Sequence, residues 1–100
     1  MTLEEMKAEL VAEIRRQYTE CKRRQHEVMR EPPRSFAEQE SRSRILSGIR
    51  EEYRWFIGPA FQRLRELCAT KEMDGGDWVL NPVEPAHDAE ARRLIAGQDG

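Results

Sequence analysis

The chain has few of the residues on which compact chemical sites depend. It contains two cysteines and two histidines in 100 residues, at positions 21, 68, 26 and 87. Cys21 and His26 lie five positions apart, on different sides of a helix, whereas a zinc site needs four ligands that converge from short spacings. We therefore expect no metal and no cofactor. Both cysteines are expected to be buried thiols in a reducing compartment.

Long apolar runs and targeting signals are also missing. The apolar runs are short, like the one at Phe56-Ile57, which ends at Gly58, and none approaches the length that spans a membrane. Residues 1–5 are acidic where a signal peptide would be basic. Gly75-Gly76 lacks the flanking strand, helix and lysine of a phosphate-binding loop. These observations predict a cytoplasmic protein that has no membrane partner and is not an enzyme.

What the chain does have is charge and enough apolar side chains to fold. Charged residues make up 36% of the sequence and hydrophobic residues 38%, yet the net charge is only −2. A disordered chain of this length would be poorer in apolar residues and more one-sided in charge. At 100 residues the chain amounts to one small domain.

Residues 2–30 have the spacing of one amphipathic helix. Thr2 and Glu5 form a capping box, which satisfies backbone N–H groups that have no partner within the helix. No proline or glycine interrupts the segment. The inward positions recur every three or four residues, about 3.6 per turn; they are Leu3, Met6, Leu10, Ile14, Tyr18, Cys21, Gln25 and Val28.

A second helix is predicted over residues 36–70. Pro32-Pro33 ends the first helix, and Ser35 with Glu38 forms another capping box. The second apolar stripe keeps its phase across Gly58-Pro59, which favours one long helix kinked there. Two helices, with Pro59 as the first residue of the second, are the alternative. The stripe comprises Leu46, Ile49, Tyr53, Phe56, Ala60, Leu64 and Leu67.

Residues 1–70 are therefore predicted to form an all-α antiparallel helical hairpin. The two helices have nearly equal lengths and a short connection, as in other helical hairpins. Folding the chain back about residues 33–34 gives three apolar pairs: Ile14 with Tyr53, Tyr18 with Ile49, and Leu10 with Ile57.

Residues 71–100 are predicted to form a separate, largely irregular C-terminal arm. Residues 74–77, Asp-Gly-Gly-Asp, are typical of a turn. Residues 78–80 suit an extended piece, but no second strand is evident beside them. This piece should then lie on the helices, pair across a dimer or dock onto another protein. A short last helix is predicted over about residues 87–96 and ends at Gly97.

More apolar side chains are present than one hairpin can cover. Burial of a large apolar side chain contributes about 1.5–3 kcal/mol, so five left exposed would forfeit about 10 kcal/mol, comparable to the stability of a whole domain. The C-terminal arm can cover some of them. A second copy, giving a four-helix bundle, would cover the rest, so we predict a homodimer; a monomer with a wrapped arm is the alternative.

The chain contains a basic stretch that bears on nucleic-acid binding. Residues 15–34 carry seven basic and three acidic side chains, whereas residues 71–100 carry three basic and seven acidic ones. Glutamates three positions before Arg16, Arg23 and Arg30 favour a self-neutralised helix surface over a phosphate-binding ridge. The residues that would bind nucleic acid are Arg15, Arg16, Lys22, Arg23 and Arg30.

Four apolar residues are the candidates for contact with a partner protein. An aromatic displaced from the helix seam serves as a dimer contact or as an anchor for another protein. An extended apolar piece within an acidic arm can add to a partner's sheet edge, or pack back over the hairpin. The candidates are Trp55, Phe61, Trp78 and Leu80.

The sequence thus favours a small non-enzymatic interaction module: an adaptor, inhibitor or regulator that acts by covering a surface of another protein. Its size and composition are also compatible with an origin in a phage or another mobile element. The alternative function is a nucleic-acid-binding regulator that uses the arginine-rich face of the first helix.

Overall fold

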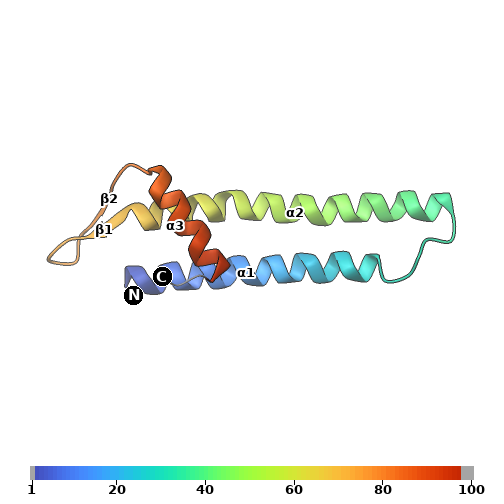
Figure 1. Ribbon diagram of the computed structural model, residues 1–100, viewed down its shortest axis with the longest axis horizontal. Coiled ribbons are helices and arrows are strands. Elements are labelled where there is room, and N and C mark those ends of the chain that lie inside the picture. Colours follow the sequence, from blue (N-terminus) through green and yellow to red (C-terminus); the bar gives the residue numbers. More distant parts are fainter. Residues whose placement is uncertain (1, 98–100) are drawn as a thin grey trace.

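The computed structural model describes residues 2–97 and is mostly helical (Figure 1). Its elements are α1 (Leu3–Val28), α2 (Phe36–Ala69), β1 (Thr70–Glu72), β2 (Trp78–Leu80) and α3 (Pro85–Ala96). The two long helices lie antiparallel, and α3 crosses one end of the pair (Figure 1). The hairpin and the short last helix are confirmed. The molecule is elongated, with extents of 64 × 22 × 21 Å.

Local sequence accounts for the helix ends. The Glu5 N–H donates to Thr2 Oγ1 at 3.1 Å, and the Glu38 N–H donates to Ser35 Oγ at 3.1 Å, so both predicted N-caps form. α1 ends at Val28, two residues before the predicted end. α3 begins at Pro85, not at residue 87, because proline fits the first helical turn, where its missing N–H is not needed.

α2 continues through Pro59 as one helix, so the alternative of two helices with Pro59 at the start of the second is wrong. Proline cannot donate to the carbonyl four residues earlier, which belongs to Trp55. Both residues lie on the exposed side of the helix, where water can take the place of the missing donor.

The predicted register of the two helices is wrong by about one turn. Tyr18 lies against Tyr53, with ring centroids 6.0 Å apart, and not against Ile49. Ile14 belongs to a cluster with Ala60 and Leu64. The start of α2 extends beyond the end of α1, and the connecting segment runs out to meet it (Figure 1). The chain therefore turns back later than the two prolines suggested.

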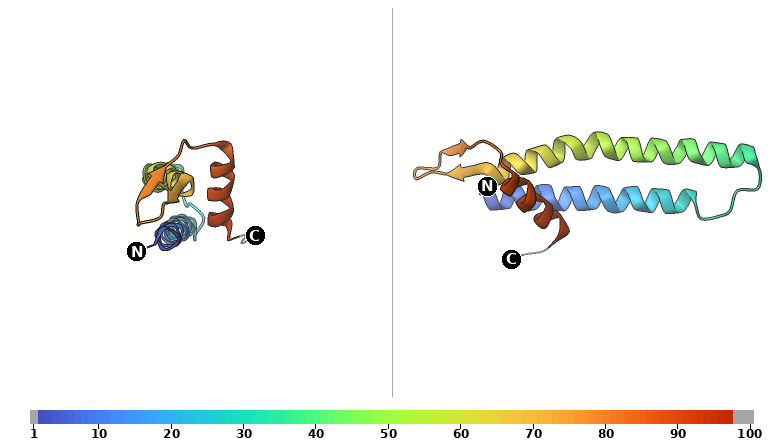
Figure 2. Two further views of the ribbon diagram at one scale, coloured as in Figure 1. Left: turned by 90° about the vertical axis from the view of Figure 1, so that its left-hand side faces the viewer. Right: turned by 45° about the horizontal axis from the view of Figure 1, so that its top comes forward.

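The buried face of α1 is also rotated relative to the prediction. Lys7 and Val11 are buried, whereas Tyr18 is 50% exposed. α3 packs on the side of the hairpin that carries Val11, and Figure 2 shows it against one face of the helix pair. The third helix thus decides which side of α1 is covered.

The extended piece at residues 78–80 does have a partner strand within the chain, which corrects the expectation that it had none. β1 and β2 form an antiparallel hairpin in which Thr70 pairs with Leu80 and Glu72 with Trp78. Gly75 and Gly76 adopt φ values of 96° and 86° in the turn, a conformation that glycine allows. β1 was missed from the sequence because its three residues directly follow a long helix and are too few to show strand periodicity. The arm is therefore less irregular than predicted: it contains a β-hairpin and a helix, and residues 81–84 between them belong to neither.

Candidate protein-binding surfaces

The two ends of the helical hairpin differ in how well they are covered. We call residues 3–16 and 58–69 together with α3 the proximal half, and residues 17–28 and 36–57 the distal half. Three helices meet in the proximal half, and its core is Leu3, Val11, Ile14, Ala60, Leu64, Leu67, Ala69 and Ala91. In the distal half only Cys21 and Ile49 are buried. The distal half is thus a two-helix layer open on both faces.

α3 is held on the proximal half by polar contacts as well as apolar ones. Arg15 donates from Nε to the Ile95 carbonyl at 2.9 Å and from Nη2 to the Leu94 carbonyl at 2.7 Å. The buried Lys7 lies 3.9 Å from a carboxylate oxygen of Glu90. Cations of the hairpin therefore bind the acidic side chains and the last carbonyls of this helix.

A second ion pair fixes the start of α3. Arg65 Nη1 lies 3.4 Å from Asp88 Oδ1, and Arg92 Nε donates to Asp88 Oδ2 at 2.9 Å. The hydrogen bond from Arg92 lowers the pKa of the Asp88 carboxyl, with a further contribution from Arg65. Asp88 is therefore ionised at neutral pH and joins the two elements.

Phe61, one of the predicted partner-binding residues, lies under α3. Its ring is flanked by the guanidinium carbons of Arg65 at 5.1 Å and Arg92 at 5.2 Å, within the range of cation–π attraction. It also packs against the core cluster. Its contacts therefore belong to the interior of the proximal half.

Trp55 is the most exposed large apolar side chain of the distal half, at 76%. Ile45, which is 49% exposed, lies earlier in the same helix, nearer its beginning. A Cβ added at Gly48 or Gly58 would meet no atom within 4 Å. Contacts within the chain thus require neither glycine, and this part of α2 is bare.

Trp78 and Leu80 are exposed on the small β-hairpin. The Trp78 indole N–H donates to Glu72 Oε1 at 3.2 Å, and the same oxygen accepts from the Leu3 N–H at 3.3 Å. This shared carboxylate ties β2 to the beginning of α1. A hydrogen bond within the chain therefore fixes the Trp78 side chain, whereas the apolar side chain of Leu80 makes none.

The structure does not bring the five predicted nucleic-acid-binding residues into one unpaired ridge. Arg16 pairs with Glu13, and Arg23 pairs with both Glu20 and Glu27. The hydrogen bond from Arg23 lowers the pKa of the Glu20 carboxyl. The remaining three have different fates: Arg15 binds α3, Arg30 lies beyond the end of α1, and Lys22 makes no ion pair within residues 2–97.

A different basic cluster appears across the helix seam. A groove of about 290 Å³ in the distal half has Tyr18, Tyr53 and Ile57 among its lining residues, with Lys22, Arg50 and Arg54 beside them. Neither carboxylates nor ion-pair partners of these three cations lie in the groove lining. Sequence reasoning missed this cluster because it combines single residues from two helices whose register was not known. Burial, followed by the nearby Cys21 and Tyr18, raises the pKa of the Tyr53 phenol.

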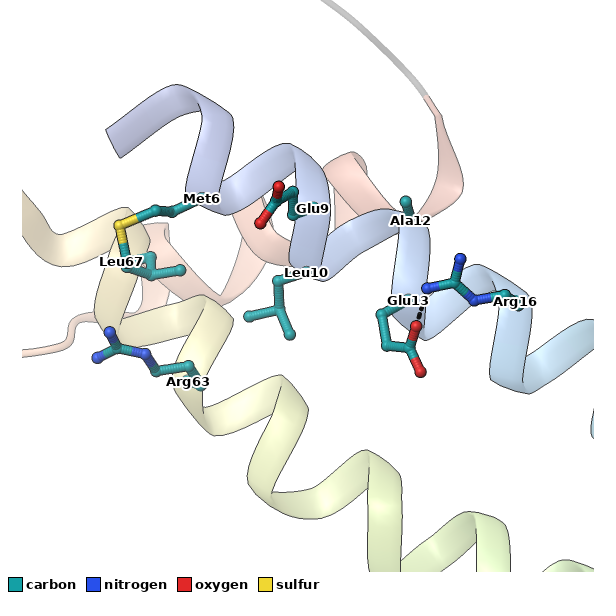
Figure 3. A pocket seen from close by; sticks show the side chains of 8 residues that line it. All are labelled: Met6, Glu9, Leu10, Ala12, Glu13, Arg16, Arg63 and Leu67. Atoms are coloured by element: carbon teal, nitrogen blue, oxygen red, sulfur yellow. Dashed lines mark hydrogen bonds and ion pairs between the residues drawn. The ribbon is translucent and has the colours of Figure 1, made fainter. Parts of the chain in front are cut away.

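A larger groove of about 620 Å³ lies between α1 and α2 in the proximal half (Figure 3). Its apolar lining consists of Met6, Leu10, Ala12 and Leu67, and Arg63 is among its charged lining residues. Arg16 is bound to Glu13 at one end, as the dashed line in Figure 3 shows. The charged groups of this groove are therefore partly neutralised, unlike those beside the tyrosines.

Both cysteines are unpaired thiols. Gln25 Nε2 donates to the buried Cys21 Sγ at 3.5 Å. Burial, with Glu90 adding to it, raises the pKa of the Cys68 thiol to about 11. Cys68 is therefore protonated at neutral pH, a state that disfavours nucleophilic attack.

Comparisons with known proteins add no further information on this arrangement. No protein-family model, no curated protein and no solved structure matches the chain. None of the helices described is both long and apolar enough to cross a membrane. Within residues 2–97, no three histidine, cysteine, aspartate or glutamate side chains are grouped so as to hold a metal ion.

Proposed function

We propose that the protein is a small non-enzymatic protein–protein interaction module that works as a homodimer. Two copies pair through the distal halves of their hairpins and form a four-helix bundle there. The module then serves as an adaptor, inhibitor or regulator by covering a surface of another protein. The cytoplasm stays the predicted compartment.

The observation that supports this proposal is the excess surface of the single chain. Its accessible surface is 7556 Å², whereas a compact monomer of this mass exposes about 5,900 Å². Its radius of gyration is 18.2 Å, against about 13 Å for a compact domain of this length. A stable interface buries about 800 Å² on each partner, so the excess is large enough for one.

The exposed apolar side chains supply the chemistry for such an interface. Trp55 and Ile45 project from a part of α2 that no other segment covers. Tryptophan at the centre of an interface is a frequent energetic hot spot. An isologous contact between two copies of α2 would bury Trp55 and Ile45 of each copy.

Sedimentation velocity of the purified protein tests the dimer. We expect a species of twice 11.8 kDa at micromolar concentration, and a single-chain species for the Ile45→Glu and Trp55→Ala double variant. Because both side chains are exposed, the variant should keep its helical circular dichroism. Met73→Glu is the matched control, since Met73 is 46% exposed but lies in the turn of the β-hairpin. A wild-type protein that sediments as a single chain at 100 micromolar would refute the dimer.

Affinity purification of a tagged copy tests the wider function. We expect a stoichiometric protein that stays bound after nuclease treatment. Recovery of nucleic acid alone, lost as the salt concentration rises, would instead favour the nucleic-acid-binding regulator.

A further inference from the structure

We propose that the groove between Tyr18 and Tyr53 is a docking site for an acidic amphipathic helix of a partner protein. The site lies on the distal half of the hairpin and is separate from the exposed face of Trp55. It deepens the proposed function by naming the chemistry of a partner.

The charge of the groove is the first argument. Lys22, Arg50 and Arg54 line it, and none of them pairs with a carboxylate in the described part of the chain. Most other arginines of the hairpin are paired; examples are Arg23 with Glu20, and Arg24 with Glu52 at 2.5 Å. Three unpaired cations around one groove create a local positive potential that attracts a negatively charged partner.

The floor of the groove is the second argument. The two tyrosine rings and Ile57 provide apolar and aromatic surface, and Lys22 Nζ lies 5.5 Å from the centre of the Tyr18 ring. An apolar floor with charged edges is how a helix-binding groove recognises the two faces of an amphipathic helix. Duplex nucleic acid has no apolar ridge to fill the floor, and its binding commonly uses about 6–10 phosphate contacts, more than three cations supply.

The hairpin already binds an amphipathic helix, α3, by the same kind of contacts. α3 packs on the hairpin through Ala91, Leu94 and Ile95, while its acidic residues face hairpin cations. These contacts join Asp88 to Arg65 at 3.4 Å and Glu90 to Lys7 at 3.9 Å. The tyrosine groove offers the same combination of apolar contact and cations, without an occupant from the described chain.

The length of the open seam fits a short helix. α1 continues from Tyr18 to Val28, about 15 Å at 1.5 Å per residue. This span accommodates about three turns of a helix. We therefore expect the partner to present acidic residues beside apolar ones spaced three and four positions apart.

Fluorescence anisotropy with two synthetic peptides tests the proposal. The probe is a capped, labelled peptide about four helical turns long, with leucines spaced three and four apart and glutamates elsewhere. The comparison peptide has lysine in place of every glutamate. We expect the full-length protein to bind the glutamate peptide at least about tenfold more tightly, and the difference to shrink as salt increases.

Charge-reversal variants locate the binding. Arg50→Glu with Arg54→Glu should weaken binding of the glutamate peptide by at least about tenfold. Arg34→Glu with Arg44→Glu is the matched control, because it makes the same change in net charge at exposed positions outside the groove lining. Circular dichroism checks that both proteins remain folded. Equal losses in the two double variants would overturn the proposal, as would equal binding of the two peptides.

A short DNA duplex distinguishes the remaining class of ligand. If the duplex binds more tightly than the glutamate peptide, and Arg50→Glu with Arg54→Glu abolishes its binding, the groove is a nucleic-acid site and the proposal fails. Sedimentation of the same samples reports self-association separately. Loss of peptide binding with the dimer intact would therefore reject the groove and leave the proposed dimer standing.

Discussion

The proximal and distal halves of the hairpin are built from the same two helices but differ in how much of their apolar surface is covered. In the proximal half, α3 covers the seam, so that Leu64 and Ala91 have no exposed surface. In the distal half the same seam is uncovered, and Trp55 is 76% exposed. Two helices share one line of contact and leave their flanks in water, whereas a third helix closes a core.

The difference also separates two uses of charge. Near α3, Arg15, Arg65 and Lys7 bind groups of the third helix. Around the tyrosine groove, Lys22, Arg50 and Arg54 have no such partner in the described chain. The charges of the proximal half thus hold the chain's own third helix, whereas the cations of the distal half are available to a binding partner.

The largest effect is expected from Ala91→Glu. Ala91 is fully buried between α3 and the hairpin, and an unpaired carboxylate there costs about 3–5 kcal/mol. We expect α3 to leave the hairpin and its amides to lose protection from hydrogen exchange. Ala89→Glu places the same charge on the exposed side of α3 and should leave the protection unchanged. Retained protection in Ala91→Glu would contradict the packing described for α3.

A truncation of the core should distinguish the two halves next. Leu64→Ala removes a fully buried side chain of the proximal half and should lower the free energy of unfolding by about 3–4 kcal/mol. Leu46→Ala, at a half-buried position of the distal half, should cost about 1 kcal/mol. Urea denaturation measures both. Equal losses would mean that the distal half is as well packed as the proximal one.

Replacing a glycine with alanine should change the stability of the protein in opposite directions in the two halves. Gly97 has a φ of 77°, and an added Cβ would lie 2.9 Å from Arg15 Nη2; Gly97→Ala should therefore destabilise the protein by about 1 kcal/mol. Gly48 lies inside α2 with open space around it. Gly48→Ala should stabilise the single chain by about 1 kcal/mol, because alanine favours the helix. Thermal unfolding checks both signs, and a destabilising Gly48→Ala would reveal a close neighbour in the distal half.

A further effect, confined to alkaline pH, is expected from Cys68. Its folded pKa of about 11 lies above the ordinary value of 9.0, so the unfolded chain releases this proton first. The contribution of this thiol to stability is then fully present below pH 9 and is lost as the pH rises from about 9 to 11. The decline should be steeper in the wild-type protein than in Cys68→Ala, as measured by urea denaturation at several pH values. Parallel declines would show that its partly buried position does not raise the pKa of this thiol.

The helices were predictable because their signals are local. The Thr2 and Ser35 caps and the three-and-four spacing lie within single segments, and each appears in the structure as expected. Gly97 ends α3 in a left-handed conformation, again as its position suggested. β1 was not predicted, since three residues after a long helix carry no periodicity and gain their partner only through the turn.

The candidate surfaces were predicted less well, because they depend on the distance between residues far apart in the chain. Trp55 was recognised from its angle on the helix, and it is exposed. Phe61 was grouped with it, but the docking of α3 covers its ring. The basic ridge on α1 was assembled from one helix, whereas the unpaired cations of the groove come from two.

The sequence by itself therefore determined three helices, the N-caps of the two long ones and the antiparallel hairpin, since backbone hydrogen bonding and apolar periodicity act over a few residues. Only the tertiary structure decided the register, the face of α1 that is buried, and which cations remain unpaired. The physical reason is that these properties depend on where α3 packs and where the chain turns back. Both are settled by contacts between segments about 20–80 residues apart, each favourable only when the others form.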